Sequence, residues 1–436
     1  MNMARVATEI LEFWKQDKIF EKSVSVREGS PTFTFYEGPP SANGTPGIHH
    51  VMARTVKDIF CRFKTLQGYQ VKRKGGWDTH GLPVELQVEK ELGITKDDIG
   101  KKISIEEYNK KCRETVMKYK DQWDDLTVKM GYWVDLESPY ITYEKEYIET
   151  LWWILKQLYD KKLLYKGYTI QPYSPAAGTG LSSHELNLPG TYKDVKDTSI
   201  VAQFKVKRDA KSEFLFKTDS EVFILAWTTT PWTLPANLAI AVNPKFEYAL
   251  VWIDGNVTVI AAALVEKVTK LAKAEQVVEI ARATGDKLLN LRYRHPFIDP
   301  SRGEGAARWT YQGVGRDPSK LFRLVPADYV TLDDGTGLVH TAPGHGVEDY
   351  QTGLRDGLPI YCPVQPDGTY DGSAPDWLQS TPGSRIDVWK ANALIVTRLR
   401  ESGHMFHDFT FSHSYPHDWR SKTPTIFRCT EQWFVS

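Results

Sequence analysis

The stretch Thr32–Leu82, TFTFYEGPPSANGTPGIHHVMARTVKDIFCRFKTLQGYQVKRKGGWDTHGL, decides the fold. Alternating residues from Thr32 to Glu37 predict a strand, and a Gly/Pro-rich turn follows it. A helical pattern then ends at Gly68, and YQVKR predicts a second strand, which leads into GGWDTHGLP. The apolar residues of the helix share one face: Val56, Ile59, Phe60, Phe63 and Leu66. Strand, helix and strand form a βαβ unit, which predicts a parallel sheet with a ligand crevice at the strands' carboxyl ends.

Length and composition set the class of protein. At about 150 residues per domain, 436 residues predict two to three domains. A hydrophobic fraction of 41% and a charged fraction of 25% exclude disordered and collagen-like chains. Lys and Arg together number 55, and Asp and Glu together also number 55, so the formal net charge is zero. No overall positive field therefore favours non-specific nucleic-acid binding.

Cysteines and apolar runs indicate the compartment. The four cysteines are Cys61, Cys112, Cys362 and Cys429, and their spacing disfavours a disulfide framework or a thiolate zinc site. The first residues carry charges among apolar positions, unlike a signal peptide, and no window approaches the ~18 apolar residues of a membrane span. We therefore expect a cytoplasmic protein without membrane contact.

The texture of the chain changes along its length. Residues 8–21 predict a short amphipathic helix, and the charged segment from Lys90 to Lys166 predicts helices. From about Tyr168, short β-rich runs such as IVAQFKV, VFILAWTTT and YALVWI predict a separate, mostly β domain that continues to about Ile395, where short helices return.

The turn EGPPSANGTPGIHH is the first candidate site. Its glycines allow the backbone to approach a ligand, and two imidazoles at a helix N-terminus suit a phosphate. The alternative is a Pro/Gly-rich turn whose histidine only caps the helix.

Two further motifs lie in the β-rich part. AWTTTPWTLPAN places four hydroxyls after an apolar strand, where they can hold a ribose or a water; the alternative is an ordinary β-branched strand end. GTGLVHTAPGHGVEDY holds His340 and Asp349 on a glycine-rich loop, which can place an imidazole and a carboxylate around one pocket; the alternative is a hairpin with surface polar residues.

Together these segments resemble the class I aminoacyl-tRNA synthetases. EGPPSANGTPGIHH is similar to their nucleotide signature, the threonine and His340 blocks to an inserted editing domain, and HSYPHDWRSKTPTIFRCTEQWF to the return to the catalytic domain. GGWDTHGLPVE and WTTTPWTLPAN favour the isoleucine members over the valine and leucine members. The resemblance implies an α/β fold: an incomplete Rossmann-like, parallel-sheet catalytic domain in 1–180 and 396–436, interrupted by a mostly β editing domain in 181–395.

The resemblance also implies roles for single residues. The substrates would be isoleucine, ATP with Mg²⁺ as its counter-ion, and tRNA(Ile), and we expect a monomer. Gly38, Pro39 and Asp78 would hold isoleucine, with Trp433 as a wall of its pocket. Gly47, His49 and His50 would meet ATP, although the usual His-Ile-Gly-His order here is Gly-Ile-His-His. The editing residues would be Thr228, Thr229, Thr230, Thr233, Asn237, His340 and Asp349.

Some features of the family are missing from these residues. Its zinc knuckle often lies near the segment QPYSPAAGTGLSSHE, but Ser174 and Ala177 stand there without a cysteine, so we expect no zinc. We expect His404, His407, His413 and His417 to lie across a loop and to hold no metal. The lysine-bearing KMSKS loop and the anticodon-binding helices are also missing, so we expect little adenylation but a complete editing domain.

Two functions therefore remain open, an isoleucine-tRNA ligase and a stand-alone editing hydrolase, while zero net charge disfavours a simple tRNA-binding module.

Overall fold

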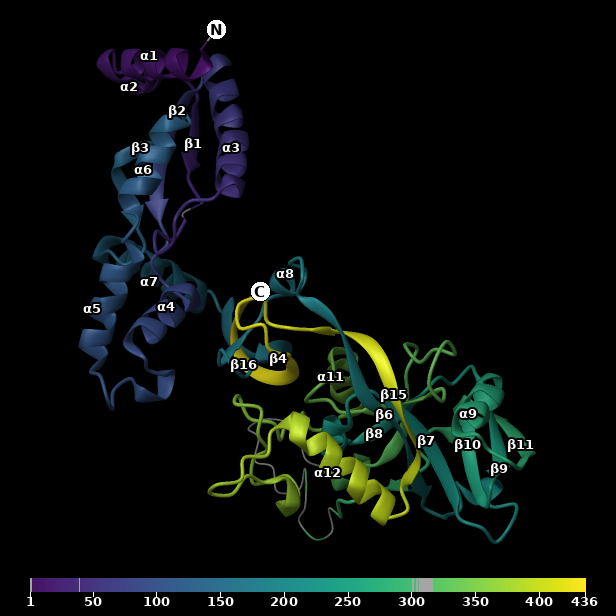
Figure 1. The fold of residues 1–436 in the computed structure, drawn as a ribbon. Helices are drawn as coiled ribbons and strands as arrows, with labels where there is room; N and C mark the ends of the chain where they lie inside the picture. The colour runs from purple at the N-terminus through teal and green to yellow at the C-terminus, as the bar shows by residue number, and fades with distance from the viewer. Residues whose placement is uncertain (1, 39, 300–301, 303–304, 306–316) are drawn as a thin grey trace. The chain divides into compact units, whose positions relative to one another are not determined.

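The computed structural model describes residues 2–38, 40–299, 302, 305 and 317–436. Two compact units divide the chain: Met1–Tyr165 with Val435–Ser436, and Lys166–Phe434. The first unit contains a parallel sheet and the second a large mixed sheet, so the α/β class with a separate β-rich part is confirmed (Figure 1). The domain limits expected at 180/181 and 395/396 stay a prediction.

The βαβ unit lies in the first unit as predicted. Strand β1 (Thr32–Tyr36) pairs in parallel with β2 (Gln70–Trp77), and α3 (Ile48–Leu66) connects them. A third strand, β3 (Asp135–Ile141), extends the parallel sheet to the order β1-β2-β3. The prediction of helices throughout Lys90–Lys166 was wrong at this strand, because DLESPYI is a partly exposed, polar segment without an apolar run.

The remaining helices of the first unit follow the charged patterns. The single helix expected at 8–21 is instead two helices, because the left-handed backbone at Lys18 (φ 50°) separates them. On α3, the buried side chains are Arg54, Cys61 and Thr65, while the apolar residues noted in the sequence are at least half exposed. The helices are α1 (Met3–Gln16), α2 (Ile19–Ser25), α4 (Leu82–Leu92), α5 (Ile105–Val116), α6 (Lys120–Lys129) and α7 (Lys145–Asp160).

A ten-stranded mixed sheet forms the second unit. Its central path runs β11-β9-β10-β7-β14-β8-β13, and β6 joins it through β7 and also pairs with β12 and β15. The strands are β6 (Tyr192–Val206), β7 (Val222–Thr228), β8 (Ala239–Val242), β9 (Glu247–Ile253), β10 (Asn256–Ala261), β11 (Val277–Thr284), β12 (Tyr293–Arg294), β13 (Arg323–Pro326), β14 (Leu338–Thr341) and β15 (Met405–Pro416).

Smaller elements complete this unit. A second sheet has the order β16-β4-β5. These elements are β4 (Leu164–Ser174), β5 (Thr179–Gly180), β16 (Ile426–Val435), α8 (Ser183–Leu186), the 3-10 helix η3 (Pro231–Ala236), α9 (Val265–Ala272), α10 (Gly285–Leu288), α11 (Val347–Asp356) and α12 (Val388–Glu401).

Burial explains why the apolar runs form the centre of the large sheet. Strands β7, β8 and β10 are almost wholly buried, as expected for strands with both faces covered. In contrast, β15 is mostly half-buried, alternates between half-buried and exposed residues from Phe409 to Tyr415, and pairs with β6 along most of its length. The histidines expected on a loop therefore lie on or directly beside a strand. Within the described residues, no helix is both long and apolar enough to cross a membrane.

Candidate functional site

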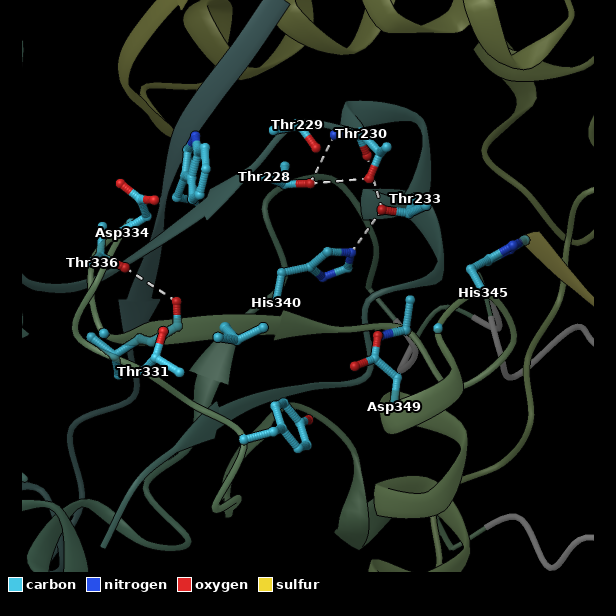
Figure 2. A pocket seen from close by; sticks show the side chains of 18 residues that line it. Thr228, Thr229, Thr230, Thr233, Thr331, Asp334, Thr336, His340, His345 and Asp349 are labelled. Atoms are coloured by element: carbon cyan, nitrogen blue, oxygen red, sulfur yellow. Dashed lines mark hydrogen bonds between the residues drawn. The ribbon is translucent and has the colours of Figure 1, made fainter. Parts of the chain in front are cut away.

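A pocket of about 450 Å³ lies in the second unit, where β7 and β14 lead into their loops. Figure 2 shows side chains from η3, β14 and α11 around it. Six predicted editing residues line this pocket: Thr228, Thr229, Thr230, Thr233, His340 and Asp349. The structure thus brings together two sequence motifs that are more than a hundred residues apart, since β14 pairs with both β7 and β8.

Hydrogen bonds fix the imidazole of His340 from both sides. The amide nitrogen of Asn237 donates to Nδ1 at 2.8 Å, so the neutral ring carries its hydrogen on Nε2 and donates to Thr233 Oγ1 at 3.0 Å. The Tyr293 hydroxyl in turn donates to Asn237 Oδ1 at 2.6 Å. Burial, followed by the charges of His295 and His345, lowers the pKa of His340 to about 3. The ring is therefore a rigid, uncharged wall of the pocket.

Asn237 has a different position from the other predicted editing residues. Its side chain is 1% exposed and is not among the pocket-lining residues. Besides His340, its amide group donates to the carbonyl of Ala239 at 2.9 Å. Asn237 is therefore placed to hold His340 rather than to touch a ligand.

Asp349 lies in the first turn of α11. Its Oδ2 accepts a hydrogen bond from the Ala342 N–H at 2.9 Å, and the Tyr329 hydroxyl also bonds to the carboxyl. Burial raises the pKa of Asp349 to about 6 in spite of these bonds. A Cβ at Gly346 would come within 2.7 Å of Oδ2, so any side chain there would displace the carboxylate from this position. A cation in the pocket would favour the ionised form of the carboxyl.

The threonines form the opposite wall. Thr230 N–H donates to Thr228 Oγ1 at 3.0 Å, and the two hydroxyls are 3.2 Å apart. Thr233 Oγ1 donates to the carbonyl of Thr230 at 2.9 Å, which fixes the turn into η3. These hydroxyls can donate and accept, as a sugar hydroxyl or a water requires.

Sequence reasoning missed several pocket residues. They are Trp227, Tyr329, Thr331, Asp334, Thr336 and His345. Of these, Trp227, Thr336 and His345 stand inside the quoted motifs, next to residues that had already been assigned to a site. His345 points away from Asp349 in Figure 2, and its Nδ1 donates to the carbonyl of Phe427 at 2.9 Å. It therefore holds the loop to β16, and burial lowers its pKa to about 4.

The nucleotide-signature residues lie at the carboxyl edge of the first unit's sheet. Gly38 follows β1 and Asp78 follows β2, whose parallel pairing places both at this edge, and the Asp78 N–H donates to the carbonyl of Pro40 at 3.0 Å. Gly47 precedes α3, and its N–H donates to His50 Nδ1 at 2.9 Å. Such an edge is the usual ligand position in parallel sheets.

The two histidines of this signature are neighbours. The ring centroids of His49 and His50 are 3.8 Å apart, and His50 packs edge-on against Trp123. Burial, followed by the charges of His49 and Arg54, lowers the pKa of His50. Both rings lie in the first turn of α3, where they can face an anion.

Two further residues predicted to contact isoleucine, Pro39 and Trp433, are not placed at this edge by the structure. Pro39 lies outside the described residues. Trp433 belongs to the second unit, on β16, where it is 63% exposed and Lys166 Nζ lies 5.8 Å from its ring centroid.

The comparisons with known proteins cover the residues of both candidate sites. Positions 9–436 match the model for class I tRNA synthetases (I, L, M and V). An isoleucine–tRNA ligase of Cytophaga hutchinsonii is 50% identical over 99% of the chain and 41% of that relative, and one of Bacteroides fragilis is 46% identical over 100% and 41%. The chain thus spans about two fifths of these relatives.

Among solved structures, the chain is similar to an Agrobacterium radiobacter LeuRS in a ternary complex with tRNA and LeuAMS. The TM-score is 0.32 at 16% identity, over 98% of this chain and 49% of that one. By the family match and the two relatives, the chain belongs to the class I tRNA synthetases.

Proposed function

We propose that the chain serves isoleucine–tRNA ligation, in which ATP activates isoleucine, tRNA(Ile) receives it, and valyl-tRNA(Ile) formed in error is hydrolysed. The names of the relatives and the carboxyl-edge site of the first unit support the ligation step. There Asp78 would pair with the isoleucine ammonium group, and His49 and His50 would meet the phosphates of ATP, with Mg²⁺ as counter-ion. Gly38 would contact the amino acid, while the roles of Pro39 and Trp433 stay predictions from the resemblance.

The hydrolytic step rests on one observation: a fixed, neutral His340 and the Asp349 carboxylate face the same pocket. The α-ammonium group of the bound valyl ester would pair with Asp349. The threonine hydroxyls would hold the terminal ribose and a water. Attack of that water on the ester carbonyl breaks the bond to the ribose oxygen and releases valine and the free 3′ end of the tRNA.

His340 is assigned a steric role, not a basic one. Its Nδ1 accepts from Asn237 and its Nε2–H donates to Thr233, so neither nitrogen is available to take a proton from water. In this family a second, hydrolytic site removes the smaller amino acid. Forcing an extra methylene against a fixed ring costs about 1–3 kcal/mol, a roughly ten- to hundred-fold preference for valine.

Deacylation of valyl-tRNA(Ile) by the purified chain tests this function. We expect release of valine well above the buffer rate and its loss in Asp349→Ala. A stable ester in the presence of the folded wild-type chain would overturn the proposal.

The alternative of a stand-alone editing hydrolase is supported by the position of all editing residues within Lys166–Phe434. Isoleucine-dependent pyrophosphate exchange by the same preparation distinguishes the two functions. Exchange that is lost in His50→Ala favours the ligase, whereas deacylation without exchange favours the hydrolase.

A further inference from the structure

A fully buried carboxylate joins two turns of the second unit that are far apart in sequence. Asp418 is 0% exposed. Its Oδ2 accepts from the hydroxyls of Ser174 at 2.7 Å and Ser421 at 2.8 Å, and its Oδ1 accepts from the Arg420 N–H at 2.9 Å. Ser174 precedes Asp418 by 244 residues, so this single carboxylate connects both turns.

Each turn is also closed by its own hydrogen bonds. In the first, Ser174 Oγ accepts from the Ala177 N–H at 3.2 Å and the Ser174 carbonyl from Gly178 at 2.8 Å. In the second, the Asp418 N–H donates to the carbonyl of Thr423, and Lys422 N–H donates to that of Asp418, both at 2.8 Å. Two tight turns therefore face each other across the carboxylate.

The spacing of these residues is that of a metal knuckle. Positions 174 and 177 are separated by two residues, as are 418 and 421, which is the spacing of paired ligands in tetrahedral zinc sites. The side chains here are two hydroxyls, a methyl group and a carboxylate. Zinc in such a knuckle needs deprotonated thiolates or imidazoles, and the hydroxyls already donate to Asp418, so this set does not fit the zinc expected from the family.

The surroundings favour the ionised carboxylate. Burial alone raises the pKa of Asp418, but hydrogen bonds from Arg420, Ser174 and Ser421 outweigh burial and lower it. Arg420 also pairs with Glu185 at 2.7 Å, and Glu185 accepts from the Trp419 indole at 3.1 Å. The guanidinium of Arg420 is thus engaged by Glu185, and Asp418 is stabilised chiefly by its neutral hydrogen-bond donors.

We propose that Asp418 acts as a metal-free clamp, which holds the 174–178 and 418–423 turns together at the place where the resemblance implies a zinc knuckle. The first turn connects β4 to β5, and the second lies between β15 and β16. In Figure 1 the long β6/β15 ribbon leaves the small β4/β16 sheet at this point. The clamp thus fixes the root of the ribbon that enters the large sheet.

Thermal unfolding of the full chain gives the first test. Asp418→Ala leaves two hydroxyls and an N–H without their acceptor and should lower the Tm by roughly 5–10 °C. Asp418→Asn keeps one acceptor oxygen and should recover part of this loss. The exposed Asp194 on β6 supplies the matched control, since Asp194→Ala should leave Tm within about 1 °C. An Asp418→Ala chain as stable as the control would overturn the clamp.

Metal binding gives the second test. The wild-type chain should contain less than about 0.1 equivalent of zinc, the trace level expected of a protein without a zinc site. A chelator should not change its Tm. Converting positions 174, 177, 418 and 421 together to cysteine should create a site that binds one Co²⁺ with tetrahedral thiolate absorption.

The wild-type chain, which has the same four native cysteines, is the control for cobalt. Stoichiometric zinc in the wild-type chain, with a Tm that falls on chelation, would contradict a metal-free clamp. If the quadruple variant folds but shows no thiolate absorption, the two turns do not converge as described.

Discussion

Replacing Asp349 by Asn is expected to stabilise the fold at pH values above the ordinary pKa of 3.8, most strongly above pH 6, while it removes hydrolysis of valyl-tRNA(Ile). Burial holds the pKa of this carboxyl at about 6, so ionising it is unfavourable in the folded chain. The amide keeps an oxygen that can accept from the Ala342 N–H, 2.9 Å from the native carboxylate oxygen. It carries no charge to pair with an ammonium group, so stability and activity should change in opposite directions.

The magnitude follows from the difference between the ordinary pKa of 3.8 and the value of about 6 in the folded chain. Because the folded pKa is the higher one, the stability that the protonated group supplies is complete below pH 3.8 and is lost as pH rises through 6. At about 1.4 kcal/mol per pH unit, Asp349 costs about 1.6 kcal/mol at pH 5 and at most about 3 kcal/mol at pH 8, relative to Asn. The second value is an upper limit because part of the side chain remains exposed in the pocket.

Urea unfolding at pH 5 and pH 8 measures this difference. Asp349→Asn should be the more stable chain at both, with the gap wider at pH 8. Glu348→Gln changes the neighbouring exposed carboxylate and should alter the unfolding free energy by less than about 1 kcal/mol at either pH. An Asn variant that is less stable than wild type, or a gap that does not depend on pH, would refute the reasoning.

Three further predictions concern the pocket and the first unit. The kcat/KM for valyl-tRNA(Ile) hydrolysis should fall about tenfold per pH unit below pH 6, because only ionised Asp349 pairs with the ammonium group; a profile that stays flat down to pH 5 would speak against that pairing. Asn237→Ala should free the His340 ring and reduce the preference for valyl over isoleucyl ester by roughly tenfold, with a smaller loss in Tyr293→Phe, and an unchanged preference in Asn237→Ala would mean that the ring needs no such support. Lys57→Met removes the cation 2.5 Å from the buried Glu37 and should lower the unfolding free energy by roughly 2–3 kcal/mol. Lys145→Met breaks an exposed ion pair and should lower it by less than about 0.5 kcal/mol. Equal losses in the two variants would contradict the argument that burial of Glu37 makes its ion pair the stronger one.

Sequence patterns over a few neighbouring residues were enough to predict the βαβ unit. The alternation before Glu37 and the glycine after α3 specified the βαβ unit, which the structure confirms. Strand β15 escaped prediction for a different reason. Phe409, Phe411 and Tyr415 alternate with polar residues, but His407 and His413 at the same alternating positions count as polar and hide a half-buried face.

The pocket residues likewise divide into those that could be predicted from the sequence and those that could not. The threonines, His340 and Asp349 lie in or shortly after the apolar strands β7 and β14, within short segments of sequence, so their motifs were visible in the sequence. Tyr293 reaches Asn237 only because β12 pairs with β6 in the folded sheet, and Tyr329 follows β13, which is paired with β8. Contacts of this kind depend on strand order, which the pattern of one chain does not encode.

The central claim is that this pocket distinguishes amino acids by size against His340. The most direct measurement compares deacylation of valyl-tRNA(Ile) and isoleucyl-tRNA(Ile) by wild type and His340→Ala. Wild type should hydrolyse the valyl ester and spare the isoleucyl ester, while His340→Ala should hydrolyse both, since Asp349 remains in place. A His340→Ala chain that clears valyl-tRNA(Ile) but still spares isoleucyl-tRNA(Ile) would contradict the account.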